Sequence, residues 1–385
     1  MSQTKAQLVS GSAAQDLTVD NINTTSINSG QVSGRRNIII NGAMQVAQRG
    51  TSSTSSGHYT VDRFKVTNTG TDESPTQAQV DVASGTTPYT SGFRKALKVT
   101  NGNQTGGAGA ADFIWIQHII EAQDIATSGW NYTSSSSYVT LSFWIKSSVA
   151  QDFKGYLRTR DGTNYEYPFA TGALTADTWT KVTKTISGNS NLQLDTDNEA
   201  GLEINLFPFL GTDRTDNGAT ENAWATYNSA QRTRDNTSTW YTTNDATLEI
   251  TGYQLEVGST ATDFEHRSFH EELQLCKRYF QKMTRVSQEV FCTGYYESDT
   301  IGRHALQLPV TMRTDPTTTF SAASTFTNIY TGSLTSGTSI GIINTSPESV
   351  FTTLTVAAGG GTDGQANLLG AANSQTATIS IDAEL

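Results

Sequence analysis

The sequence has little of several features, and each absence excludes a class of protein. Of its 385 residues only 35% are hydrophobic and 16% are charged, and Ser, Thr, Asn and Gly take up much of the rest. No apolar run approaches the roughly 20 residues that cross a bilayer as a helix, so we expect no membrane insertion. Residues 1–12 hold one lysine and no apolar stretch. This argues against a secretory signal and predicts synthesis in the cytosol.

Cysteine and positive charge are scarce as well. The two cysteines, Cys276 and Cys292, are too few and too far apart for a cysteine-based metal site. Without an export signal we expect two free, mostly buried thiols rather than a disulfide. The formal net charge is -11, and no cluster of Lys and Arg offsets it. An acidic surface repels phosphate backbones, so nucleic-acid binding is disfavoured.

Reactive motifs are missing. The five histidines are dispersed, and the sequence has no G-x-S-x-G, H-E-x-x-H or P-loop motif. We therefore predict that the protein is not an enzyme and needs no cofactor. Paired carboxylates leave a polysaccharide depolymerase open as an alternative, and loop acids could also hold a structural calcium ion, without EF-hand spacing. The candidate acid pairs are Asp195 with Asp197, Asp213 with Asp216, and Glu199 with Glu203.

What the sequence does contain is a series of short alternating strands. In the clearest of them Val139, Leu141, Phe143 and Ile145 share one face, with polar or amphipathic residues on the other. Gly-containing loops at irregular spacing favour an antiparallel sandwich over a solenoid. We also expect a strand at 37–42, stopped by an Asn-Gly turn. In 247–257 the alternation changes phase at Gly252, which predicts a β-bulge there.

One amphipathic helix is expected, over residues 268–284. Ser268 with Glu271 three residues later forms a capping box. Phe269, Leu273, Cys276 and Phe280 follow on one face. The fold class is therefore all-β, with four parts: an extended N-terminal arm (1–34), a central antiparallel sandwich (35–267), the connecting helix (268–284) and a small C-terminal β-sandwich (285–385).

The N-terminal arm has too few apolar residues for a core of its own. Without a partner such a chain is poorly ordered, so another chain must cover its apolar side chains. This points to oligomerisation or to docking on a larger assembly. The candidate docking residues are Leu8, Leu17, Val19 and Ile22.

Three stretches resemble a family of phage tail-fibre and appendage proteins with a carbohydrate-binding-module-like jelly roll, frequent in marine phages. They are RNIIINGAMQVAQRG (36–50) with YTVDRF (59–64), VTLSFWIKS (139–147), and ITGYQLEVG (250–258) with FEHRS (264–268) and LCKRYF (275–280). The resemblance spans roughly residues 35–282. It implies a homotrimeric virion protein whose arm docks on phage tail or capsid proteins, with a jelly roll as its central domain.

A long polar segment between Gly211 and Asn244 holds the best candidates for ligand contact. Sugar rings present apolar C–H faces, so lectin-like sites combine exposed aromatic rings with Asp, Asn or Arg. The candidate glycan contacts are Trp224, Tyr227, Trp240, Tyr241, Asp213 and Arg214. The alternative is that Trp224 and Trp240 fasten the loop to the sandwich. Polar loops at 295–300 and 328–337, with Tyr295, Tyr296 and Tyr330, are a second candidate surface.

The function that these observations favour is adhesion to a host surface polysaccharide by a trimeric tail fibre or receptor-binding appendage. Linking three shallow sites raises their combined affinity through effective concentration. Two alternatives stay open: an architectural fibre or adaptor on capsid or tail without a receptor of its own, and the depolymerase named above.

Overall fold

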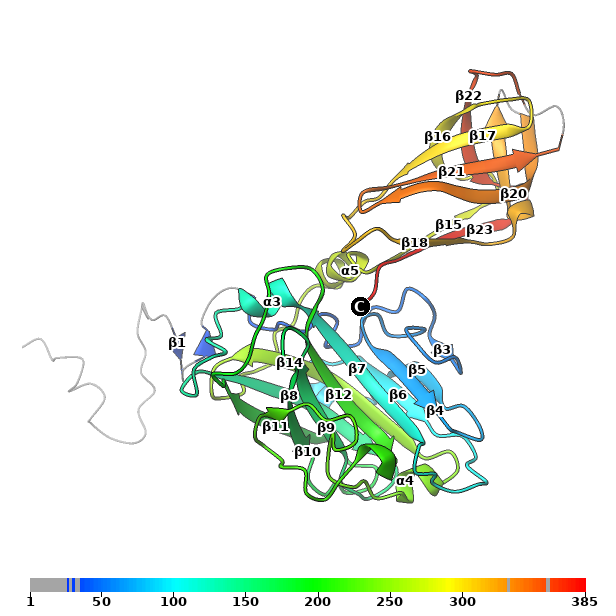
Figure 1. Cartoon of the computed structure of the whole chain (residues 1–385). Helices are drawn as coiled ribbons and strands as arrows, with labels where there is room; N and C mark the ends of the chain where they lie inside the picture. The colour runs from blue at the N-terminus through cyan, green and yellow to red at the C-terminus, as the bar shows by residue number, and fades with distance from the viewer. Residues whose placement is uncertain (1–25, 28–29, 32–34, 331–332, 358–360) are drawn as a thin grey trace, which may run out of the picture.

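The computed structural model shows an all-β chain in two parts, joined by one short helix (Figure 1). It describes residues 26–27, 30–31, 35–330, 333–357 and 361–385. The larger part is a sandwich of two six-stranded sheets, and the smaller is a closed barrel. The predicted docking residues Leu8, Leu17, Val19 and Ile22 lie outside the described residues. A two-stranded ribbon, β1 (Ser26–Ile27) with β2 (Gly30–Gln31), precedes the sandwich.

Both sheets of the sandwich are antiparallel throughout. The first, here the β14 sheet, has the order β11 (Thr180–Ser187), β8 (Tyr138–Ser147), β14 (Thr247–Val257), β6 (Lys95–Thr100), β5 (Thr76–Asp81) and β3 (Ser52–Ser53). The second, the β12 sheet, has the order β13 (Ala225–Thr226), β10 (Tyr165–Ala170), β9 (Lys154–Thr159), β12 (Ala200–Leu210), β7 (Phe113–Glu121) and β4 (Lys65–Thr69).

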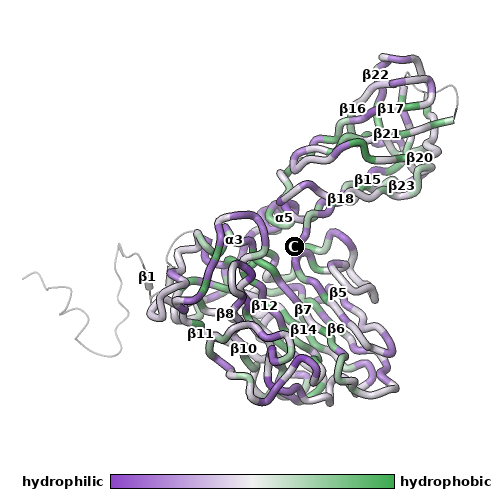
Figure 2. The backbone as a smooth tube through the Cα atoms, viewed as in Figure 1, coloured by the Kyte–Doolittle hydropathy of each residue, from purple (hydrophilic) through white to green (hydrophobic). Residues whose placement is uncertain are grey.

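The core of the sandwich lies between these sheets. The alternation predicted for β8 is confirmed, because Val139, Leu141, Phe143 and Ile145 are all fully buried in it. Facing residues of the β12 sheet complete the core, Leu206 among them. In Figure 2 hydrophobic segments follow these strands, and hydrophilic segments gather in the loops. Burial of the apolar side chains between the two sheets thus accounts for a stable sandwich in a chain with few apolar residues.

Residues 37–42 form no strand, contrary to the sequence prediction. The segment runs beside β14 with two backbone hydrogen bonds, from the Ile38 amide to the Leu255 carbonyl (2.9 Å) and from the Tyr253 amide to the Gly42 carbonyl (2.9 Å). The Asn37 side chain makes further bonds, donating to the Tyr253 carbonyl (3.1 Å) and accepting from the Leu255 amide (3.1 Å). The segment needs apolar side chains although it is not a strand. Ile39 packs in the sandwich core, and Ile40 packs in a second buried cluster beneath the helix.

The β-bulge predicted in β14 is confirmed. The register against β8 shifts between Thr251 and Gln254, and Gly252 has a φ of 64°. A Cβ at this position would lie 2.7 Å from the Phe93 ring. Glycine is required both by the left-handed backbone and by the close contact.

The connecting helix α5 (Phe269–Lys277) is shorter than predicted. Its start is confirmed: the Ser268 side chain accepts a hydrogen bond from the Glu271 amide. It ends early because Phe280 and the residues after it join a strand. Of the predicted apolar face, Phe269 is 55% exposed and Cys276 is fully buried. The remaining helical segments are short: α2 (Thr87–Thr90), α3 (Ala122–Ala126), α4 (Thr239–Thr242), η1 (Thr212–Arg214) and η2 (Ala323–Thr325).

The C-terminal part is a closed barrel rather than the predicted sandwich. Its strands are β16 (Val290–Tyr296), β17 (Ile301–Gln307), β21 (Ser349–Val356), β20 (Ser333–Ser346), β19 (Phe326–Tyr330) and β22 (Ala366–Ala371). Closure follows because β16 pairs with both β17 and β22. A three-stranded sheet, the stem sheet, lies between barrel and helix: β15 (Phe280–Val286), β23 (Thr376–Asp382) and β18 (Thr317–Phe320). Neither cysteine is in a disulfide, as predicted: Cys276 is buried and Cys292 half-buried.

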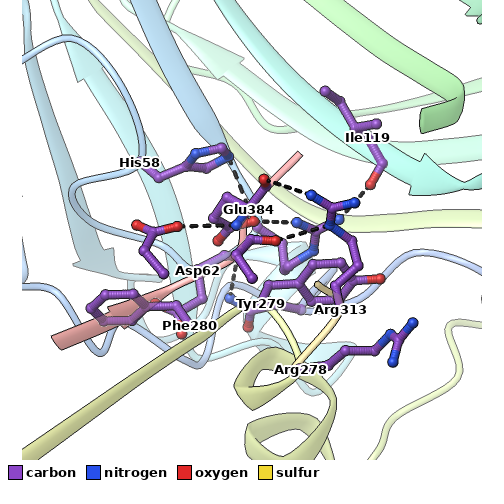
Figure 3. Close-up of polar contacts among 12 residues, drawn as sticks. His58, Asp62, Ile119, Arg278, Tyr279, Phe280, Arg313 and Glu384 are labelled. Atoms are coloured by element: carbon purple, nitrogen blue, oxygen red, sulfur yellow. Dashed lines mark hydrogen bonds and ion pairs between the residues drawn. The ribbon is translucent and has the colours of Figure 1, made fainter. Parts of the chain in front are cut away.

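The penultimate residue of the chain joins the barrel to the sandwich. The Glu384 carboxylate accepts hydrogen bonds from Arg63 and from Arg49 (3.3 Å), both residues of the sandwich (Figure 3). The Arg63 guanidinium also donates to the Ile119 carbonyl (2.5 Å) and lies 3.4 Å from the centre of the Tyr279 ring. Since the side chain of Arg63 is 1% exposed and that of Glu384 is 6% exposed, this is a buried ion pair.

Candidate functional site

Two of the six predicted glycan contacts are core residues. Trp240 is fully buried, and Tyr241 is 1% exposed and stacks on Phe209 with ring centres 4.2 Å apart. The Tyr241 hydroxyl donates to Asp112 (3.0 Å). Because no ligand can reach these rings without unfolding α4, the prediction that they contact a glycan is wrong. Both fasten the long loop to the sandwich, and for Trp240 this is the alternative that the sequence left open.

Trp224 and Asp213 do not take part in a common site either. Trp224 is half-buried, its indole N–H donates to the Ser187 carbonyl (2.7 Å), and its ring packs edge-on against Tyr167. Asp213 is exposed at η1. Trp224 therefore holds the loop in place, as the same alternative proposed.

The other two candidates, Tyr227 and Arg214, lie on the outer face of the β12 sheet, in the two halves of a row of stacked groups. The Arg214 guanidinium lies 4.7 Å from the centre of the Phe113 ring. Phe113 stacks on Trp115 with ring centres 4.4 Å apart. At the other end the Arg158 guanidinium lies 3.5 Å from the centre of the Tyr227 ring.

Arg232 connects the two halves of this row. Its guanidinium lies 5.4 Å from the centre of the Trp115 ring and 5.8 Å from that of Tyr227. Its backbone amide donates to the Arg214 carbonyl (2.9 Å), which places two turns of the loop side by side. We call this alternation of aromatic rings and guanidinium groups the outer-face strip, made of Arg214, Phe113, Trp115, Arg232, Tyr227 and Arg158.

A polar network adjoins the strip at Arg158. The Glu203 carboxylate, buried on β12, accepts from Arg158 (3.4 Å) and Arg160 (2.9 Å). It also accepts from the hydroxyl of Tyr156 (3.2 Å) and the amide of Gln117 (3.2 Å). Because four side chains converge on one buried carboxylate, their positions are fixed before any ligand arrives.

Several buried polar atoms beside the strip have no protein hydrogen-bond partner. These include the indole nitrogen of Trp115, Nε of Arg232 and both amide atoms of Asn205. Glu166, opposite Arg158 in the register, leaves Oε2 without a partner, and burial raises the pKa of its carboxyl to about 7. An unpartnered buried polar group costs free energy, about 1 to 3 kcal/mol. A second group of such atoms lies in the barrel, at Tyr296, His304, Asn328 and Asn367.

The glycan contacts predicted from the sequence did not include Phe113, Trp115, Arg158 or Arg232. The signal for the first two was present, since Phe113, Trp115 and Gln117 alternate with the core residues Ile114 and Ile116. Both faces of β7 are therefore apolar at this end, and the alternation alone does not tell the core face from the outer one. Arg158 and Arg232 come to the rings from β9 and the loop, through pairing that is remote in sequence.

Two of the acid pairs predicted as alternatives have structural explanations. Glu199 is exposed and pairs with Arg313 (3.4 Å), whereas Glu203 is buried. Asp216 accepts from the Gly218 amide and from Gln231, as a turn residue. Among the described residues no group of three or more His, Cys, Asp or Glu side chains could hold a metal ion. No helix in that part of the chain is long and apolar enough to span a membrane.

The second predicted surface, on the barrel, is also changed. Tyr295 is 45% exposed, but Tyr296 is fully buried inside the barrel. The predicted loop at 328–337 is largely the strand pair β19 and β20, with Asn328 itself buried. Tyr295 stays available on the surface, without the aromatic neighbours that surround Trp115.

Comparisons with known proteins give remote structural similarities. No protein-family model and no curated protein matches the chain. The enzymatically active domain of tailspike protein 4 from bacteriophage CBA120 is similar over 57% of this chain, with 9% identity and a TM-score of 0.30, and the match spans 21% of that protein. The N-terminal cellulose-binding domain of Cellulomonas fimi β-1,4-glucanase C is similar over 56% of this chain and 99% of its own, with 12% identity and a TM-score of 0.27.

A third similar structure is the family 11 carbohydrate-binding module of Clostridium thermocellum, solved with a mixed-linked tetrasaccharide. The match covers 56% of this chain and 98% of that one, with 10% identity and a TM-score of 0.26. At such low values we draw the function from the residues of the outer-face strip themselves.

Proposed function

We propose that this protein is a non-catalytic adhesin that binds a surface polysaccharide through the outer face of the β12 sheet. The observation that carries the proposal is the outer-face strip, in which Trp115 and Tyr227 alternate with guanidinium groups beside unpartnered polar atoms. Half-buried aromatic rings can stack on the apolar faces of sugars. Guanidinium and amide groups bind hydroxyls in fixed directions. The strip offers both kinds of contact along one line, which suits an extended saccharide.

The setting of the adhesin is proposed to be a bacteriophage virion, as a homotrimeric tail fibre or related appendage. Its support is the resemblance of 36–50 with 59–64, of 139–147, and of 250–258 with 264–268 and 275–280 to phage appendage proteins. In this proposal residues 1–34 dock on phage tail or capsid proteins, and the sandwich and barrel project outward. Three copies of a shallow site on one fibre raise the effective affinity by orders of magnitude without any new contact.

The proposal is tested with single substitutions that each remove one aromatic ring of the outer-face strip. Trp115→Ala and Tyr227→Ala are each expected to weaken binding of the full chain to host envelope polysaccharide by at least about tenfold, the equivalent of about 1.4 kcal/mol. Calorimetry or biolayer interferometry with immobilised polysaccharide measures the change. Circular dichroism and urea denaturation of each variant check that the sandwich is intact.

Tyr295→Ala is the matched control, because it removes an exposed ring from the barrel. It is expected to bind as the parent does. If Tyr295→Ala abolishes binding while Trp115→Ala and Tyr227→Ala do not, the receptor site lies on the barrel and the proposal is wrong. If no variant and no parent protein binds any host glycan, the protein is an architectural fibre.

A second candidate function, polysaccharide hydrolysis, is favoured by one specific observation. Glu166 and Glu203 face the same residue, Arg158, from the strands on either side. Two strand spacings separate their Cα atoms by about 10 Å, whereas inverting glycosidases hold their two carboxyl groups about 6.5 to 9.5 Å apart. The raised pKa of Glu166, about 7, suits a general acid. Release of reducing ends from host polysaccharide, abolished by Glu166→Gln, would support this candidate over simple adhesion.

A further inference from the structure

A pocket of about 430 Å³ lies where the sandwich meets the stem sheet. The sandwich contributes Arg49, His58, Tyr59 and Lys65, and the stem sheet contributes Lys282 among others. The volume falls in the range of ligand sites, roughly 300 to 1,000 Å³. Because both parts of the chain line this pocket, its shape depends on how they are joined.

The pocket is basic although the chain as a whole is strongly acidic, with a formal charge of -11. Its one lining carboxylate, Asp382, is already paired with Arg49 (2.8 Å). The buried Glu384 behind it is paired with Arg49 and Arg63. Within the described residues neither Lys65 nor Lys282 has a carboxylate within 4.0 Å. The Lys282 ammonium donates only to the Arg49 carbonyl (3.3 Å). Two ammonium groups are therefore left to attract an anion.

The remaining lining groups suit a sugar ring rather than a bare ion. Tyr59 is 46% exposed, so its ring is open to a ligand. The imidazole of His58 is largely buried, and burial lowers its pKa to about 4. It is therefore neutral at pH 7 and offers hydrogen bonds rather than charge. An aromatic surface, a neutral hydrogen-bonding ring and two cations are the complement of an acidic saccharide unit.

We propose that this junction pocket binds the anionic group of an acidic saccharide, a carboxylate or a sulfate. Lys65 and Lys282 hold the anion from the two parts of the chain, and Tyr59 stacks on the sugar ring. The proposal rests on the proposed function in one respect, that the ligand is a glycan. The site itself is separate from the outer-face strip, since it shares no residue with it.

The experiment titrates the full chain with three oligosaccharides of equal length: an oligogalacturonide, a sulfated oligosaccharide and a neutral oligogalactan. The charged probes are expected to bind more tightly than the neutral one, and more weakly as ionic strength rises. Lys65→Gln and Lys282→Gln should each weaken the charged probes by about tenfold. Lys181→Gln, which removes the same charge from the exposed face of β11, should have no effect. A preference between carboxylate and sulfate identifies the source of the anion.

Equal binding of neutral and charged probes, or loss of binding in Lys181→Gln to the same extent, would overturn the proposal. Trp115→Ala separates it from the proposed function. If the junction pocket is right and the strip is wrong, Trp115→Ala keeps full affinity for the charged probes and Lys65→Gln does not. If the outer-face strip binds the glycan and the junction pocket does not, Trp115→Ala loses affinity for the charged probes and Lys65→Gln keeps it.

Discussion

Glu384→Ala is expected to lower the free energy of unfolding by about 3 to 5 kcal/mol, the cost of breaking a buried ion pair by removing one partner. The Arg63 guanidinium would keep only the Ile119 carbonyl and the Tyr279 ring as neighbours. Its side chain is 1% exposed, so water cannot replace the carboxylate. All six tryptophans lie between residues 115 and 240. Urea denaturation followed by tryptophan fluorescence therefore reports the sandwich, to which Arg63 belongs.

Two further variants make this result specific. Glu199→Ala removes an exposed carboxylate from Arg313, which keeps its bonds to the Ala383, Asn198 and Glu384 carbonyls, and is expected to cost no more than about 1 kcal/mol. Glu384→Ala combined with Arg63→Met removes both buried charges and is expected to regain most of the lost stability. If Glu384→Ala is as mild as Glu199→Ala, the last residues of the chain do not hold the barrel to the sandwich.

The barrel is expected to lose about 3 kcal/mol of stability when the pH falls from 6.5 to 4. Burial lowers the pKa of His304 from 6.5 to about 4, with Asn367 and Asn328 beside the ring. In that window the unfolded chain binds a proton that the folded barrel does not. The contribution is therefore complete above pH 6.5 and is lost as the pH falls toward 4. Hydrogen exchange of barrel peptides, corrected for intrinsic rates, measures it.

His304→Gln tests the cause, because it keeps a polar side chain and removes the proton site. The barrel of this variant is expected to have nearly the same stability at pH 6.5 and at pH 4. His270→Gln, an exposed residue of α5, should leave the parent profile unchanged. The sandwich is a poorer place for this test. Burial lowers the pKa of His58 to about 4 but raises the pKa of the Asp62 carboxyl to about 6, so their effects on stability oppose each other.

Local features of this fold could be predicted from the sequence because their causes are local. The alternation in β8, the phase change at Gly252 and the cap at Ser268 each depend on residues a few positions apart. The irregular conformation of 37–42 could not be predicted, because three isoleucines in a row favour a strand. In the structure the Asn37 side chain, rather than a paired backbone, bonds the Tyr253 carbonyl and the Leu255 amide of β14. Closure of the barrel depends on β16 meeting β22, which no local pattern specifies.

The candidate site was predicted in part for a related reason. The segment between Gly211 and Asn244 was singled out by its aromatic and charged residues, and Tyr227 and Arg214 do lie on the proposed face. Trp240 and Tyr241 were indistinguishable from them in sequence, although they are buried. Trp115 was assigned to a strand and not to a surface. A site made by stacking groups from two strands and a loop becomes visible only when the strands are paired.

Hydrogen exchange of the full chain with and without bound host polysaccharide is the most direct test of the central claim. If the outer face of the β12 sheet is where the glycan lies, protection should rise in peptides covering residues 212–238, which lie over that face. Amides in the barrel turns at 297–300 should exchange at the same rate in both samples. Protection confined to those turns, with residues 212–238 unaffected, would contradict the account.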